Sequence, residues 1–119
     1  IEIYVKTKNE DKIKDWLEAH FKQTITLSKN GGLLSAKLSN NEHNIPVNIM
    51  LNAQGGFSSI WFDSPHTNWA DDLSCAQQFV SDVGIMARCI KSSWLEGETE
   101  DPDCWLQIGK SETKEIIWK

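Results

Sequence analysis

The chain has 119 residues, of which 39% are hydrophobic and 24% are charged, and its formal net charge is −5. This size and composition are typical of one globular domain that buries its core without metals or disulfides. No apolar run approaches the roughly 20 residues of a membrane-spanning helix, which excludes a helical membrane protein. Cys75, Cys89 and Cys104 include no Cys-x-x-Cys pair and form no closed disulfide framework, so we expect reduced thiols in a cytoplasmic protein.

The first half of the chain predicts a strand, a helix and four more strands. Residues 1–6 alternate apolar and polar side chains with the period of a strand. Asn9 is suited to cap a helix over 10–21, whose apolar side chains fall on one face: Ile13, Trp16, Leu17 and Phe21. Four β-rich segments follow, separated by turn residues, at 24–27, 34–38, 45–51 and 57–62. Pro46 lacks the N–H of a strand ladder, which favours a strand start or a sheet edge there.

The second half predicts one helix and three strands. Asn68 is the best N-cap for this helix, with Asp71 at the third helical position, and Gly84 is typical of the residue that follows a helix. Apolar residues repeat at helical spacing between them: Trp69, Leu73, Ala76, Phe79 or Val80, and Val83. Strands are expected at 85–90, 105–108 and 115–118, the last two as a hairpin.

The order of these elements, β-α-β-β-β-β-α-β-β-β, predicts a single α+β domain over residues 1–119. We expect one mostly antiparallel sheet of about seven to eight strands, with both helices on one face. The chain contains no internal linker and no low-complexity tract.

The charge is unevenly distributed along the chain. Residues 61–103 hold nine acids and two bases, Arg88 and Lys91, which gives −7, whereas the remainder holds eight acids and ten bases, which gives +2. An acidic surface repels phosphates, which argues against nucleic acid or an anionic membrane as the partner. The segment instead favours a basic protein partner or a cation.

The predicted topology brings the acidic residues to one edge of the sheet. A strand-helix-strand unit runs its two strands parallel, so the loops after 57–62 and 85–90 leave at the same edge. The ordinary alternative is that Asp71 and Asp72 only stabilise the first helical turn and that 96–103 is a solvated loop. The candidate partner-binding residues combine the acids of both loops with two tryptophans as anchors: Asp63, Trp69, Asp71, Asp72, Trp94, Glu96, Glu98, Glu100, Asp101 and Asp103.

Catalytic chemistry finds little support in the sequence. Asp63-x-x-His66, with Asp71 or Asp72, offers ligands for a divalent metal such as Mn or Zn, but the spacing matches no specific motif. Cys75 with His66 is the one conceivable nucleophile and base. The glycine pairs 31–32 and 55–56 lie in turns and do not open helices, so they are not phosphate loops. We therefore predict no cofactor, no metal and no catalytic residue.

In size, acidity, lack of a catalytic motif and mixed α+β pattern, the chain resembles the immunity proteins of bacterial toxin–immunity pairs, such as contact-dependent growth inhibition systems. The resemblance rests on no diagnostic motif and transfers no residue roles. It implies a non-catalytic inhibitor that neutralises a cognate toxin domain, often a basic nuclease. Two alternatives remain open, a small metal-binding enzyme or module using Asp63, His66 and Asp71, and a self-assembling structural domain that uses a strand edge near Pro46 or the C-terminal hairpin. The sequence leaves the oligomeric state open.

Overall fold

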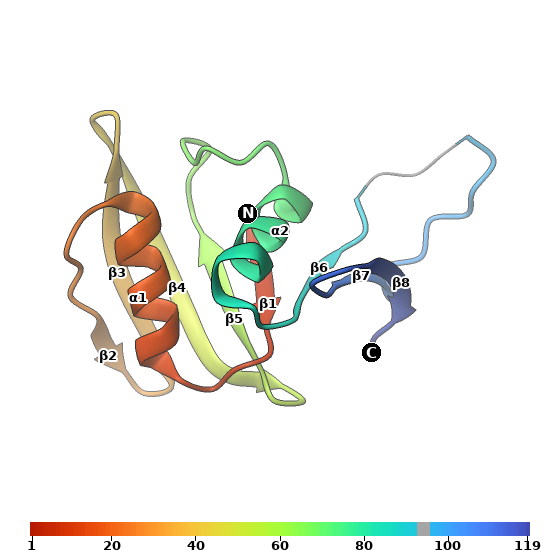
Figure 1. The fold of residues 1–119 in the computed structure, drawn as a ribbon, viewed down its shortest axis with the longest axis horizontal. Helices are drawn as coiled ribbons and strands as arrows, with labels where there is room; N and C mark the ends of the chain where they lie inside the picture. The colour runs from red at the N-terminus through yellow and green to blue at the C-terminus, as the bar shows by residue number, and fades with distance from the viewer. Residues whose placement is uncertain (93–95) are drawn as a thin grey trace.

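The computed structural model describes residues 1–92 and 96–119 of the chain (Figure 1). Ten elements follow one another in the predicted order: β1 (Glu2–Val5), α1 (Glu10–Phe21), β2 (Ser28–Asn30), β3 (Leu33–Asn40), β4 (His43–Gln54), β5 (Phe57–Phe62), α2 (Asp72–Val83), β6 (Ala87–Ile90), β7 (Cys104–Ile108) and β8 (Thr113–Ile117). No helix in the described part of the chain is long and apolar enough to cross a lipid bilayer. The predicted α+β class is confirmed.

The first strand of the chain lies inside the sheet. The eight strands pair antiparallel in the order β2-β3-β4-β5-β1-β6-β7-β8 (Figure 1). Because β1 is antiparallel to both β5 and β6, those two strands run in the same direction, as the sequence predicts. Their ends are two strand spacings apart, about 10 Å, instead of adjacent. The loops that follow β5 and β6 therefore leave from the same end of the sheet.

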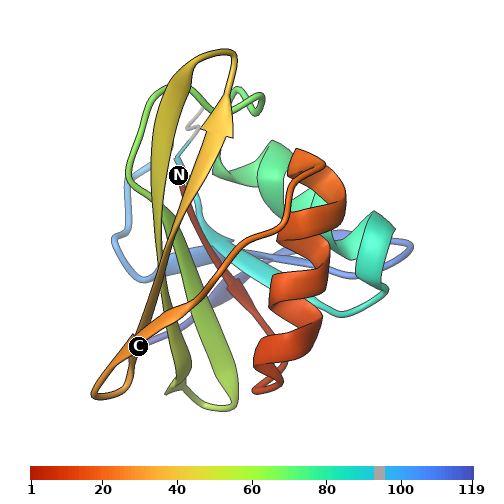
Figure 2. The ribbon, with the colours of Figure 1, turned by 90° about the vertical axis from the view of Figure 1, so that its left-hand side faces the viewer.

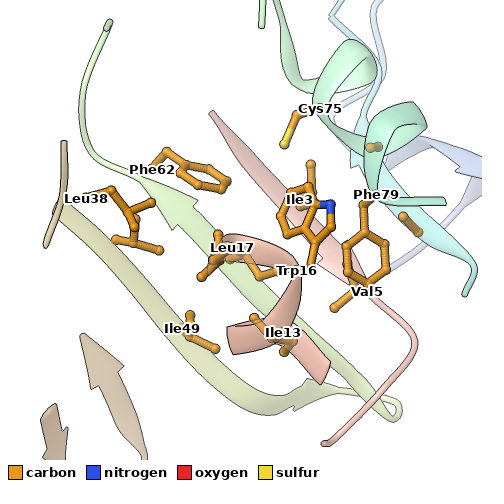
Figure 3. Close-up of a cluster of buried hydrophobic side chains, with 14 of the residues drawn as sticks. Ile3, Val5, Ile13, Trp16, Leu17, Leu38, Ile49, Phe62, Cys75 and Phe79 are labelled. Carbon is orange, nitrogen blue, oxygen red and sulfur yellow. The ribbon is translucent and has the colours of Figure 1, made fainter. Parts of the chain in front are cut away.

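Both helices pack on one face of this sheet, as predicted (Figure 2). Trp16 and Leu17 of α1 and Phe79 of α2 are buried between the helices and the sheet (Figure 3). The sheet contributes one apolar side chain at every second position, the period that places residues on one face of a strand. These inward residues include Ile3, Val5, Leu38, Ile45, Val47, Ile49, Ile60 and Phe62.

The start of α1 agrees with the sequence prediction, and the start of α2 does not. Asn9 Oδ1 accepts the N–H groups of Asp11 and Lys12, as a cap should. The N-cap of α2 is Asp71 and not Asn68, since Asp71 Oδ1 accepts the N–H of Ser74 at 2.8 Å. The Asn68 side chain instead accepts a hydrogen bond from Asn40.

Two expectations for the strands also need correction. The segment 24–27 is not a strand, because the N–H of Ile25 donates to the Glu18 side chain at 2.9 Å and not to a neighbouring strand. The paired strand follows it, at β2. Pro46 lies on no edge, since β4 is paired with both β3 and β5. The carbonyl of Pro46 accepts the N–H of Asp63, the residue just after β5. The missing N–H of Pro46 is therefore on the side of its strand that faces the end of β5.

The face of the sheet without helices carries a second aromatic cluster. The rings of Tyr4, Trp105 and Trp118 meet edge to face at 5.0–5.4 Å. The guanidinium of Arg88 lies 4.4 Å from the ring centre of Phe57 and 4.7 Å from that of Trp118. Part of this face is thus covered by the chain itself.

Candidate functional site

Trp61 lies on the helix-free face, outside that aromatic cluster. Its neighbours in β5, Ile60 and Phe62, point into the core, so strand alternation turns Trp61 outward, and 42% of its surface is exposed. The Trp61 residue is not among the partner-binding candidates that the sequence predicts. The alternation of side chains along β5 could have predicted this exposure, because a tryptophan between two core residues of one strand must face the opposite side of the sheet.

Carboxylates gather at the end of the sheet where β5 finishes and β1 begins, and one of them, Glu2, lies beside Trp61. Glu2 is the cross-strand partner of Trp61, and its N–H donates to Asp72 Oδ1 at 3.2 Å. Asp63 follows β5, and Asp71 caps α2 beside Asp72. We call these five residues, Glu2, Trp61, Asp63, Asp71 and Asp72, the Trp61 surface. It extends from the helix-free face around the sheet end to the start of α2.

The Trp61 surface carries four carboxylates. Burial raises the pKa of Glu2, the charge of Asp72 raises it further, and the N-terminal ammonium partly opposes this. Within residues 1–92 and 96–119, none of its four carboxylates forms an ion pair with lysine or arginine. Asp71 differs from Glu2, because the N–H and O–H of Ser74 lower its pKa. An approaching cation would therefore relieve like-charge repulsion, above all at Glu2.

A second acidic group follows β6. We call residues 96–103 the acidic loop, with Glu96, Glu98, Glu100, Asp101 and Asp103. Lys91 Nζ contacts Glu98 at 2.9 Å and Glu115 of β8 at 2.5 Å, and these hydrogen bonds raise the pKa of Lys91 to about 12, the bond to Glu115 most. The Asp101 side chain accepts the N–H of Asp103 at 2.8 Å, which shapes the end of the loop.

The two bases of the segment 61–103 do not neutralise its outer surface. Lys91 is occupied by Glu98 and by Glu115, an acid from outside the segment. Arg88 is stacked between two aromatic rings and donates to Gln107, and burial lowers its pKa. From outside the segment, Lys119 lies 3.9 Å from Asp103, and the other exposed acids keep most of the charge that the sequence assigns to this segment.

The structure brings the two acidic loops to the same end of the sheet but not into one cluster. Asp72 is bonded to β1, whereas Glu98 is joined through Lys91 to β8. In Figure 1 the two loops leave the same end of the sheet and diverge. The predicted shared edge is confirmed, and the charge on it is divided between two separate groups.

Of the two tryptophans predicted to anchor a partner, Trp69 and Trp94, the structure describes only Trp69. Trp69 precedes α2, and its ring stacks on His20 at 4.7 Å and on Trp16 at 5.8 Å, with further contacts to Phe21 and Phe62. Most of its ring is thus used by the fold. Trp94 lies outside the described residues. Trp61 is the tryptophan that the structure exposes beside the carboxylates.

Cys75 and His66, the pair that the sequence made conceivable as nucleophile and base, lie in different environments. Cys75 is fully buried in α2, and its burial strongly raises the pKa of its thiol, whereas His66 lies on the surface. Cys89 is buried as well, and burial raises its pKa to about 12. Thiols held in the neutral form are poor nucleophiles. The buried, neutral thiol of Cys75 is therefore unsuited to the role of nucleophile.

The side chains considered as metal ligands are placed apart from one another. In the described part of the chain, no group of three or more His, Cys, Asp or Glu side chains is arranged to hold a metal ion. Asp63, His66 and Asp71 are therefore not gathered into the three-residue set that the sequence suggested. The ring of His66 instead stacks on His43, at 3.6 Å between ring centres.

Comparisons with known protein families, with curated proteins and with solved structures find no match to this chain. The conclusions about its function therefore rest on its own geometry.

Proposed function

We propose that this chain is a non-catalytic inhibitor of the immunity-protein type, which neutralises a basic bacterial toxin domain by binding it. One observation carries the proposal: the exposed indole of Trp61 lies beside Glu2, in a group of carboxylates that form no ion pair with lysine or arginine among the described residues. Tryptophan is enriched among residues that dominate binding energies, and carboxylates beside it select a basic counterpart.

The surroundings of Trp61 support a contact larger than one side chain. Met50 and Leu33 are cross-strand partners on the same face, and 47% and 36% of their surfaces are exposed. Trp61 is the cross-strand partner of Asn48, which lies two residues before Met50 in β4 and so faces the same side of the sheet. Exposed large apolar side chains gathered on one face are typical of protein-binding surfaces. In this proposal Trp61, Met50 and Leu33 form the apolar contact, and the carboxylates form its charged rim.

The acidic loop has a different role in the proposed complex. The acidic loop follows β6, which β1 separates from the strand of Trp61, so we expect its charges to act at longer range than the contact itself (Figure 1). Charges at the rim raise the rate of association with an oppositely charged protein, and salt screens this effect. We therefore assign steering to the acidic loop and anchoring to Trp61.

The proposal is tested by growth of a bacterial host that produces the protein encoded beside the gene for this chain. We expect the neighbouring protein to arrest growth and the co-produced chain to restore it. The proposal is wrong if the neighbouring protein is harmless, or if its toxicity is the same with and without this chain.

Variants of the chain then separate anchoring from steering. Trp61→Ala should raise the dissociation rate of the purified pair at least tenfold. Neutralising exposed acids of the acidic loop alone, Glu96→Gln with Glu100→Gln and Asp101→Asn, should slow association and reduce its salt dependence. The matched control removes the same charge elsewhere, at Asp15→Asn, Glu42→Gln and Glu112→Gln, all exposed. Equal effects of the two triple variants would show that only net charge matters.

A second candidate function, self-assembly, is favoured by the last strand. β8 is an edge of the sheet, and Ile117 on it is 61% exposed. An open strand edge can pair with the edge of another chain. Assembly predicts that the mass from solution scattering rises with concentration and that Ile117→Lys abolishes the rise. A constant monomer mass would remove this candidate.

A further inference from the structure

We propose that His43 and His66 form a two-imidazole site for a divalent ion of the zinc, nickel and copper class. The rings come from segments far apart in the sequence, His43 from the start of β4 and His66 from the loop after β5. Their centres are 3.6 Å apart and their planes differ by 6°. No local pattern in the sequence connects His43 with His66.

Asn40 connects the backbone segments that carry His43 and His66. It is the register partner of His43 across the β3–β4 turn. Its side-chain amide donates to the carbonyl of His66 at 2.7 Å and to Asn68 Oδ1 at 3.0 Å. The N–H of His66 also donates to Ser64 Oγ at 3.1 Å. Asn40 thus holds the loop of His66 beside the β3–β4 turn that carries His43.

This spacing suits a shared metal ion. Imidazole nitrogens bind zinc at about 2.0–2.1 Å, so two of them on one tetrahedral ion lie about 3.3 Å from each other. In the structure the ring centres are 3.6 Å apart and the rings are parallel, so each ring must turn about its side-chain bonds before one nitrogen of each points at the same ion. Both side chains are exposed, which leaves room for this rotation. Water would complete the coordination.

The ligand type selects the class of ion. Neutral imidazole suits zinc, copper and nickel, whereas magnesium and calcium require several oxygen ligands. A bound ion would link the β3–β4 turn to the loop that carries Asp63, and binding to the folded state alone stabilises that state. Because protons compete for the same nitrogens, binding should weaken on acidification.

The test is a calorimetric titration of tag-free protein with Ni²⁺ and with Zn²⁺ near neutral pH. We expect one ion per chain, a higher melting temperature with either ion, and no binding of Mg²⁺. His43→Ala and His66→Ala should each weaken Ni²⁺ binding at least tenfold. His20→Ala is the matched control, because it removes the remaining histidine, which lies on α1 away from this pair, and should leave Ni²⁺ binding unchanged.

Two further measurements keep the result interpretable. Melting curves without metal should show that His43→Ala and His66→Ala are folded, as expected for exposed side chains. Asn40→Ala retains both ligands but loses the bond to the His66 carbonyl, so it should weaken Ni²⁺ binding by a smaller factor. The site does not exist if the wild type binds neither ion, or if both histidine variants bind Ni²⁺ as tightly as the wild type does.

Discussion

The indole Nε1 of Trp16 in α1 donates a hydrogen bond of 3.0 Å to Oδ2 of Asp82 in α2. Trp16 is only 4% exposed, and its ring also stacks on Trp69. A single side chain therefore joins both helices to the loop that ends in the α2 cap. The position of the Trp61 surface depends on this packing, since Asp71 and Asp72 begin the second helix.

We expect Asp82→Ala to lower the free energy of unfolding by about 1–3 kcal/mol, because it leaves a buried N–H without its acceptor. Urea denaturation measures the change. Asp15→Ala, which removes an exposed acid of α1, should change stability by much less. Equal losses in the two variants would mean that the hydrogen bond to Trp16 contributes nothing.

The cap of α2 gives a second prediction. Asp71→Ala should lower the free energy of unfolding by about 1 kcal/mol at neutral pH, a typical value for loss of an N-cap side chain. Asn68→Ala, at the position that local sequence favours as the cap, should cost less, because its side chain makes only an exposed contact with Asn40. The opposite ranking would restore Asn68 as the cap.

The cap contribution should also depend on pH. The hydrogen bonds from Ser74 lower the pKa of Asp71 in the folded state, so its stabilisation is present above the unfolded carboxyl pKa of about 3.9. It is lost as the pH falls through the lower, folded value. The stability difference between wild type and Asp71→Ala should therefore shrink in strong acid. A difference independent of pH would contradict this linkage.

Ser58 of β5 is a buried polar residue on the same face of the sheet as Ile60 and Phe62. Its hydroxyl donates to the Thr7 carbonyl at 2.6 Å and accepts the N–H of Asn52 at 3.1 Å. Ser58→Ala should lower the free energy of unfolding by about 1–3 kcal/mol, because two backbone groups lose their partner. Ser59→Ala makes the same chemical change on the opposite face and should cost less. Chemical denaturation of both variants decides the ranking.

His20 gives the fold a mild sensitivity to acid. Burial lowers its pKa, and the charge of Asp82 only partly opposes this. The unfolded state then binds a proton at a pH where the folded state does not, so stability falls as the pH drops below about 6.5, until the folded pKa is passed. His20→Gln should reduce the loss of stability between pH 7.5 and pH 5.5, as urea denaturation at each pH would show. An unchanged loss would assign the effect to other groups.

Local sequence determined the order and type of the elements. Asn9 and Gly84 mark helix boundaries because capping involves residues only a few positions apart. Alternating side chains identify most strands, since the two faces of a strand differ in burial. The parallel direction of β5 and β6 also followed from the sequence, because a strand-helix-strand connection favours it. The shared edge of the two acidic loops was predictable for the same reason.

Only the tertiary structure decided which strands are neighbours. β1 pairs with β5 and β6, more than 50 residues away, and no local pattern selects that pairing over others. Its insertion separates the two acidic groups, and it places Glu2 beside Trp61 and Asp72. The roles of Trp69 and Trp61, and the meeting of His43 with His66, depend likewise on contacts between distant segments. Periodicity shows which way a side chain faces, but only the packed chain determines what it meets there.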